Sequence, residues 1–288
     1  MRELYIDDNE LTDLDLSNNH LLKHLEFADN NLTTIDLSNN LLLIELFAIR
    51  NDLVSIDLAA NDSLVSVSLS NNALTTVTGV NNKPNLEGFY VSNLAHWGEY
   101  NNITSLDLSG SPSLESIYCQ NNQLTYLDLS GCPSLTSIVC NNNQLTHLNM
   151  RNGVTDALTT FDATNNDSLE CIETLNPDYA TENWTYENGN IDEGVFFSES
   201  CTALISVSPS ELYEQLFAGD SSTQVLTISN NGGIDLEWEI GSNAVGDSNA
   251  VGDWRVHYGE PSGDECIDIG TEVFSVYSDG TFLSLIHI

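Results

Sequence analysis

A repeat with a period of 21 residues constrains the fold of this chain more than any other feature of its sequence. Segment 30–38 reads NNLTTIDLS, and segment 122–130 reads NQLTYLDLS. The third position is leucine or isoleucine seven times, with steps of 21, 21, 21, 29, 21 and 21 residues, at Leu11, Leu32, Leu53, Leu74, Ile103, Leu124 and Leu145. A unit of this length cannot bury its own leucines and must stack on its neighbours, so the repeat predicts a solenoid.

A second pattern, LxxLxLxxNxL, runs between these copies. It begins at Met1, Leu22, Leu43, Leu64, Leu86, Leu114, Leu135 and Leu158. Its asparagine occurs in seven of the eight copies, at Asn9, Asn30, Asn51, Asn72, Asn122, Asn143 and Asn166. Leu94 replaces it once, beside Asn93. We expect these amides to hydrogen-bond the backbone where the chain leaves the strand, which is a structural role.

Both patterns contain short LxL segments. In such a segment the two apolar side chains point one way along a strand, and the middle side chain points the other way. Each coil is therefore expected to carry two short strands, one in each pattern, and to have no room for a long helix. The fold class predicted is mainly β.

The second pattern is the signature of leucine-rich repeats, and the chain resembles the leucine-rich-repeat proteins of environmental bacteria, in the broad internalin-like group. The resemblance continues into residues that are similar to the C-terminal cap of that family, namely 161–172, Tyr179, Asn183, Trp184 and 197–201. It implies a solenoid over residues 1–170, about eight repeats of which the first is incomplete, and a cap over 171–201. It also implies secretion and ligand binding on a concave sheet.

The cap is expected to cover the last coil with its aromatic residues, Tyr179, Trp184, Tyr186, Phe196 and Phe197. Cys171 and Cys201 bracket the segment, and a disulfide between them would stabilise the closed loop by a few kcal/mol. Such a bond requires an oxidising compartment.

The remaining cysteines have other expected roles. Cys119 and Cys140 hold equivalent inward positions in adjacent coils and are expected to be small buried hydrophobes, with a disulfide between them as the alternative. Cys132 lies in a turn, and Cys266 has no obvious partner.

The sequence after Cys201 follows a different pattern. Segments 225–229 and 234–240 alternate apolar and polar residues around an Asn-Gly-Gly turn, which predicts a hairpin. Residues 202–288 resemble an Ig-like β-sandwich module, expected to be incomplete. Met1 takes the place of the first leucine of a repeat, and the chain ends inside an apolar run. We therefore expect a fragment of a longer protein whose signal peptide was lost with the missing N-terminus.

The charge of the chain is strongly one-sided, with 43 acidic and 6 basic residues and a formal net charge of -37. Binding to nucleic acid or to an anionic lipid surface needs basic residues, so neither is expected. No apolar stretch is long enough to insert into a membrane. The charge fits a soluble protein in a salty medium, or a surface that collects cations.

The outward middle positions of the second-pattern strands are the first candidate site. They are Tyr5, Glu26, Phe47, Ser68, Tyr90, Tyr118, Val139 and Asp162. Outward aromatic residues are enriched at recognition surfaces, although strands favour aromatic residues in any case. We therefore take as candidate ligand-binding residues the apolar members of this row and the nearby Ile49, namely Tyr5, Phe47, Ile49, Tyr90, Tyr118 and Val139.

One repeat is irregular, because the step from Leu86 to Leu114 is 28 residues. The extra residues lie near 94–100, and insertions in solenoids form loops that are often on the binding side. Trp97 and Tyr100 are candidate contacts there. The alternative is that Trp97 folds back to fill the misfit.

The middle positions of the first pattern form a column that carries aspartate in five coils, at Asp15, Asp36, Asp57, Asp107 and Asp128. Stacked carboxylates about 4.8 Å apart repel each other, so nearby hydroxyls, salt or bound calcium must offset the repulsion. These aspartates are weak calcium candidates; no other cofactor is expected.

No catalytic motif is present, and His24 and His147, at outward strand positions, are expected to be solvated. The sequence therefore predicts an extracellular or cell-surface binding and adhesion module for a protein or polysaccharide, without enzyme activity. An alternative is an accessory region of a larger secreted hydrolase. A minor alternative is ice binding by the threonines that recur in register, which are Thr12, Thr33, Thr75, Thr104, Thr125 and Thr146.

Overall fold

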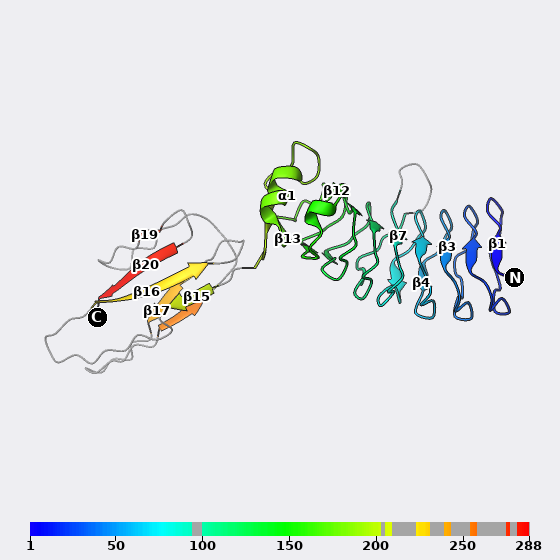
Figure 1. Ribbon diagram of the computed structural model, residues 1–288, viewed down its shortest axis with the longest axis horizontal. Coiled ribbons are helices and arrows are strands. Elements are labelled where there is room, and N and C mark those ends of the chain that lie inside the picture. The colour runs from blue at the N-terminus through cyan, green and yellow to red at the C-terminus, as the bar shows by residue number, and fades with distance from the viewer. Residues whose placement is uncertain are drawn as a thin grey trace. The chain divides into compact units, whose positions relative to one another are not determined.

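The second-pattern strands form one parallel sheet in a computed structural model of the chain (Figure 1). Its eight strands lie in the order β1 (Glu3–Tyr5), β2 (His24–Glu26), β3 (Glu45–Phe47), β5 (Ser66–Ser68), β7 (Gly88–Tyr90), β8 (Ser116–Tyr118), β10 (Ser137–Val139) and β12 (Thr160–Asp162). The register never slips, so Leu4 pairs with Leu25 and Leu25 with Leu46. Each coil therefore places its residues beside the equivalent residues of the next coil.

The structure describes residues 1–93 and 100–202 and, beyond them, the strands within 205–287. The chain divides into two units, Met1–Glu199 and Ser200–Ile288. The first unit thus ends two residues before the end of the cap expected from the sequence.

The first-pattern side of the solenoid carries fewer strands than the sequence predicts. Two sheets form there, and they contain β4 (Ser55–Asp57) with β6 (Thr76–Thr78), and β9 (Tyr126–Asp128), β11 (His147–Met150), β13 (Cys171–Thr174) and β14 (Phe196–Ser198). Segments 14–16, 35–37 and 106–108 are not strands, so the prediction that every coil carries two strands is wrong. Burial of their leucines needs only inward side chains and does not require strand pairing.

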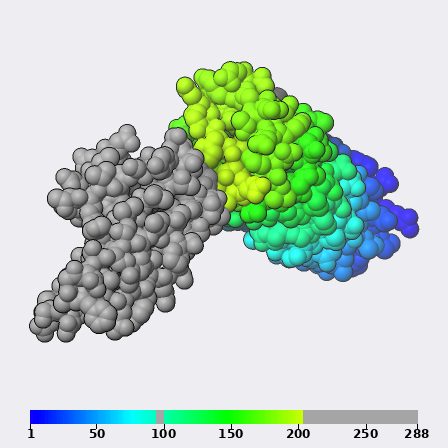
Figure 2. All heavy atoms as spheres, turned by 60° about the vertical axis from the view of Figure 1, so that its left-hand side comes forward, coloured from blue at the N-terminus to red at the C-terminus, as the bar shows by residue number. Residues whose placement is uncertain are grey.

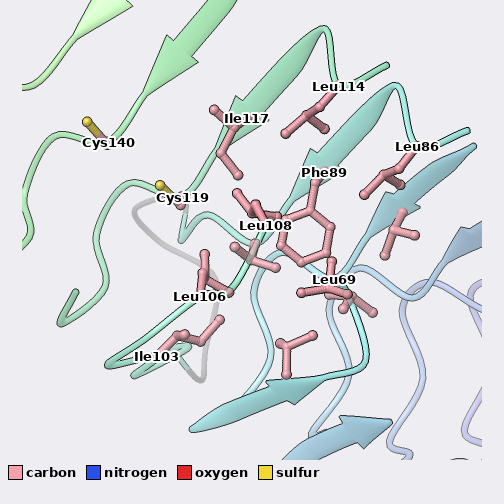
Figure 3. Close-up of a cluster of buried hydrophobic side chains, with 14 of the residues drawn as sticks. Leu69, Leu86, Phe89, Ile103, Leu106, Leu108, Leu114, Ile117, Cys119 and Cys140 are labelled. Atoms are coloured by element: carbon pink, nitrogen blue, oxygen red, sulfur yellow. The ribbon is translucent and has the colours of Figure 1, made fainter. Parts of the chain in front are cut away.

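The core is one continuous column of apolar side chains inside the coils. In Figure 3, Phe89 and Ile117 point from the eight-stranded sheet toward Leu106 and Leu108 on the opposite side. Their buried side chains belong to adjacent coils, so each coil covers the next. Truncation of one such leucine to alanine costs about 2–5 kcal/mol.

A column of buried asparagines, the asparagine ladder, closes one corner of every coil. Asn72 shows the pattern, because its Nδ2 donates to the Ala48 carbonyl in the preceding coil at 2.8 Å, and its Oδ1 accepts the Leu53 N–H at 3.1 Å. The same contacts recur along the solenoid, at Asn30, Asn51, Asn72, Asn101, Asn122, Asn143 and Asn166. The structural role expected of the ladder residues is confirmed at Asn30, Asn51, Asn72, Asn122, Asn143 and Asn166.

The irregular repeat keeps the asparagine ladder intact. Asn101, and not Leu94, occupies the ladder position of this coil, since its Oδ1 accepts the Leu74 N–H at 3.0 Å. Asn93 lies beside it: its Oδ1 accepts the Asn101 N–H at 2.7 Å, and its Nδ2 donates to the Asn101 carbonyl at 2.8 Å. These two hydrogen bonds join the residues on either side of the insertion, and we call the pair the Asn93–Asn101 clamp.

The cap continues the solenoid and then closes it. Strands β13 and β14 extend the parallel sheet of β9 and β11. Helix α1 (Pro177–Asn183) begins where the Asn176 side chain accepts the Tyr179 N–H, with proline at its first position. The ring of Trp184 packs on Phe161 at 5.7 Å between centroids.

Only part of the expected aromatic cover is used by the cap. Phe197 is buried against the core, whereas Tyr186 and Phe196 are exposed. The cap therefore covers the last coil with Trp184 and Phe197 together with the two extra strands. Figure 2 shows the cap in yellow-green, continuous with the green coils before it.

The second unit contains antiparallel strands. They are β15 (Ile205–Ser208), β16 (Thr223–Asn230), β17 (Glu239–Ser242), β18 (Trp254–His257), β19 (Ser275–Val276) and β20 (Thr281–His287). The neighbours of β16 are β15 and β20, and β17 pairs with β18. Segment 225–229 of the expected hairpin lies in β16, but residues 231–238, with the turn and most of the second segment, lie outside the described residues, so the hairpin stays a prediction. The Ig-like assignment stays a prediction.

Candidate binding surfaces

The outward face of the eight-stranded sheet presents two rows of side chains. One row contains the middle positions named above, and the other contains the residue two positions earlier in each strand, from Glu3 to Thr160. Tyr5 is exposed, while Phe47, Tyr90, Tyr118 and Val139 are half-buried. All five face outward as expected, because the residues on either side of them in the LxL segments point into the core.

Tyr90 and Tyr118 form an aromatic pair at the centre of this face. Their ring centroids are 5.4 Å apart with an interplanar angle of 89°, which is the favoured edge-to-face geometry. Ser137 Oγ, on the next strand, donates to the Tyr118 hydroxyl at 3.1 Å. The Tyr90 ring lies over Gly88, where an added Cβ would come within 2.8 Å of it. The pair is thus held in place before any ligand arrives.

Phe47 does not join this pair. Strand β5 lies between β3 and β7, and its outward Ser68 is buried. Ile49, two residues on from Phe47, is half-buried. The candidate residues therefore form a central aromatic pair and a separate N-terminal group.

The side chains around the N-terminal group are acidic. His24, expected to be solvated, has its Nδ1 2.7 Å from Glu45 Oε2. The pKa of Glu26 is raised by partial burial and then by the nearby Asp7 and Glu45 carboxylates. The sheet face thus changes from acidic at β1–β3 to aromatic and hydroxyl-rich at β7–β10.

The two candidates from the insertion have different outcomes. Tyr100 is 46% exposed and directly precedes Asn101, one of the two residues of the Asn93–Asn101 clamp. Trp97 lies outside the described residues.

The five aspartates of the first pattern act as turn caps. In each of them one carboxylate oxygen, Oδ1, accepts the backbone N–H two residues later at 2.9–3.0 Å, as at Asp36 with Ser38. The side-chain hydrogen bonds from Ser17, Ser38 and Ser109, and then these backbone bonds, lower the carboxyl pKa of Asp15, Asp36 and Asp107. Asn149 makes the same bond without a charge. The capping role accounts for the aspartates in these five coils.

The described residues contain no group of three or more His, Cys, Asp or Glu side chains suited to a metal ion. The weak calcium candidates are therefore not brought together into a site. The same part of the chain contains no helix long and apolar enough to cross a membrane.

A second aromatic pair lies on the other side of the solenoid and was missed in the sequence. Tyr126 and His147 stack with centroids 4.9 Å apart and ring planes 3° apart. His147 lies at the outward position expected of it and is half-buried, because its ring lies against Tyr126. The two residues are 21 apart, one repeat period, which is the signal that places them side by side.

The cysteines follow the expected division. Cys171 and Cys201 are disulfide-bonded. Cys119 and Cys140 are free and buried, and burial raises the thiol pKa of Cys119 to about 12. They lie in adjacent coils of Figure 3, where they fill the core as small hydrophobes. Cys132 is also free and buried.

These features define the class of the protein. Parallel 21-residue coils, an LxL sheet, the asparagine ladder and a terminal cap make this chain a mainly β leucine-rich-repeat solenoid. A model of the family described as leucine rich repeats (2 copies) matches residues 112–149.

A solved structure, the functional domain of InlJ from Listeria monocytogenes, which includes a cysteine ladder, is similar to this chain. The TM-score is 0.43 and the identity is 19%, over 81% of this chain and 59% of that chain. The present chain thus spans less than two thirds of the length of that structure. No curated protein matches the sequence.

Proposed function

We propose that this chain is an extracellular binding and adhesion module that recognises a protein or polysaccharide through the outward face of its eight-stranded sheet. The observation that carries the proposal is the Tyr90–Tyr118 pair, fixed by Ser137 and by the space over Gly88. Aromatic side chains held rigidly on a surface bind with little loss of conformational entropy.

Two further observations support the class and the location. Solenoids of this kind are typically non-catalytic scaffolds, and we propose no enzyme activity for this chain. Disulfide bonding at Cys171 and Cys201 supports an oxidising, extracellular compartment.

The experiment screens the full chain against an array of bacterial and plant polysaccharides and a panel of purified cell-surface proteins. Any binder is then titrated against Tyr90→Ala, Tyr118→Ala and Tyr186→Ala, the last of which removes an exposed tyrosine of the cap as a control. We expect each sheet variant to weaken binding at least about tenfold, as for a central hot spot, and the control to have no effect. Binders that are insensitive to both sheet variants would refute the proposed surface.

The hydrolase alternative is tested by sequencing the coding DNA on both sides. A neighbouring catalytic domain would make the solenoid an accessory region, whereas a signal peptide and further surface modules would support adhesion.

Ice binding is tested by thermal hysteresis, which we expect to be absent. Val54 interrupts the threonine row, and the Thr146 hydroxyl donates its proton to the Thr125 carbonyl at 3.2 Å, so that proton is not available to water.

A further inference from the structure

A hollow of about 380 Å³ lies on the side of the solenoid opposite the eight-stranded sheet. It lies between the coil that contains Asp107 and the coil that contains β9. Its lining residues include Asp107, Ser109, Gly110, Tyr126, Asp128 and Gly131. None of these belongs to the surface proposed above, so the hollow is a separate feature of the molecule.

The hollow forms because small residues lie beside a large one at two places. Tyr126 is stacked on His147 on one side, while the equivalent residue of the preceding coil on its other side is the small Ser105. Gly110 and Gly131 occupy the turn position that carries asparagine in the first two coils, at Asn18 and Asn39. One face of an exposed tyrosine ring is therefore left open beside two residues without side chains.

The chemistry of the lining is anionic and aromatic. Asp107 Oδ1 and Asp128 Oδ1 each accept a backbone N–H from their own turn, and the Asp107 carboxylate also accepts side-chain hydrogen bonds from Ser109 and Asn81. The Tyr126 hydroxyl lies 3.4 Å from Asp128 Oδ2, which links ring and carboxylate. The bonds from Ser109 lower the pKa of Asp107, which keeps it ionised.

We propose that this hollow is a second binding site, which takes the guanidinium group of an arginine side chain from a basic peptide segment. A guanidinium is planar, stacks on an aromatic face and bonds carboxylates through its fixed fork of N–H donors. A chain with a net charge of -37 attracts such segments over a distance, and the hollow supplies the specific contact. The site is independent of the sheet surface.

The test uses the full chain and the peptide acetyl-Gly-Arg-Gly-Arg-Gly-amide, with its citrulline analogue as an uncharged probe of the same shape. Affinities are measured by calorimetry or NMR titration at about 0.15 M salt, where charges more than about 8 Å apart are screened. We expect the citrulline peptide to bind at least about tenfold more weakly, since it lacks the charge that strengthens these bonds.

Three charge variants and one variant that fills the hollow distinguish binding in the hollow from general attraction to a negatively charged chain. Asp107→Asn and Asp128→Asn remove one charge each but keep the turn bond, as Asn149 does. Each should weaken binding about two- to fivefold, as expected for a partly exposed ion pair. Asp36→Asn makes the same change three coils, or roughly 14 Å, from Asp107 and should have no effect.

Gly131→Asn restores the residue of the first coils and fills the hollow. A Cβ at Gly131 meets only the Gly110 backbone nitrogen, at 4.0 Å, so the variant should fold without strain. It should abolish peptide binding while leaving the circular dichroism spectrum and melting temperature unchanged.

Three results would overturn the proposal. The first is a loss of affinity in Asp36→Asn equal to that in Asp107→Asn, because it would show diffuse attraction only. The second is the absence of binding to the arginine peptide. The third is binding of a neutral oligosaccharide such as maltohexaose that Gly131→Asn abolishes, because it would make the hollow a sugar site. Tyr90→Ala should leave peptide binding intact, so failure here and failure of the sheet surface are distinguishable.

Discussion

Replacement of Asn72 by alanine tests the asparagine ladder most directly. Asn72 is fully buried, and its amide donates to the carbonyls of Ala48 and Leu69 at 2.8 and 3.0 Å while accepting the Leu53 N–H. The variant leaves the buried Leu53 N–H and Ala48 carbonyl without these partners. Each unsatisfied buried group costs about 1–3 kcal/mol, so the free energy of unfolding should fall by about 2–5 kcal/mol.

The assay is urea unfolding followed by far-ultraviolet circular dichroism. With an m-value of about 2–3 kcal/mol/M, the midpoint should fall by about 1–2 M at an unchanged m-value. Asn31→Ala is the matched control, because it makes the same substitution at an exposed position of the same kind of turn and should change stability by less than about 0.5 kcal/mol. Equal midpoints for the two variants would refute the structural role of the ladder.

Three further predictions follow from local contacts. Cys119 and Cys140 should not react with a thiol reagent at pH 8 until the protein is unfolded, because burial raises their pKa and excludes the reagent; labelling of the native protein counted by mass spectrometry would contradict this. Gly88→Ala should displace the Tyr90 ring and change the near-ultraviolet dichroism, with binding to the sheet ligand reduced about as much as by Tyr90→Ala. Because the pKa of Asp36 is lowered on folding, its contribution to stability is present above the unfolded pKa of about 4 and is lost as the pH falls through the folded pKa; the stability gap between wild type and Asp36→Asn should therefore narrow between pH 5 and pH 2.5, and parallel urea midpoints across this range would count against the reasoning.

The period alone was enough to predict the solenoid, because stacking identical coils forces equivalent residues together. It placed Tyr90 and Tyr118 on one face but did not predict their edge-to-face contact, in which the Tyr90 ring lies over Gly88, two residues earlier. The Tyr126–His147 stack was missed because His147 was considered without Tyr126, the residue at the same position of the preceding coil, just before its LxL segment.

Other differences arise because a side chain can serve the backbone of its own turn. The aspartate column suggested cations, since its spacing alone predicts repulsion. In the structure each carboxylate has a backbone donor two residues away, a contact that a pattern of repeats does not reveal. In the irregular coil the sequence pattern put Leu94 at the ladder position. The insertion separates Asn93 from Asn101 in sequence, and only the hydrogen bonds in the structure show that Asn101 continues the ladder.

The clamp between Asn93 and Asn101 has a consequence for how such a protein can diversify. An insertion joined at two mutually bonded asparagines adds length without shifting the register of the coils on either side, since β7 still pairs with β8 residue for residue. The energetic cost of a longer insertion is then mainly loop closure, which grows only with the logarithm of its length. At this corner, evolution or a protein engineer can therefore exchange one insertion for another and leave the solenoid unchanged.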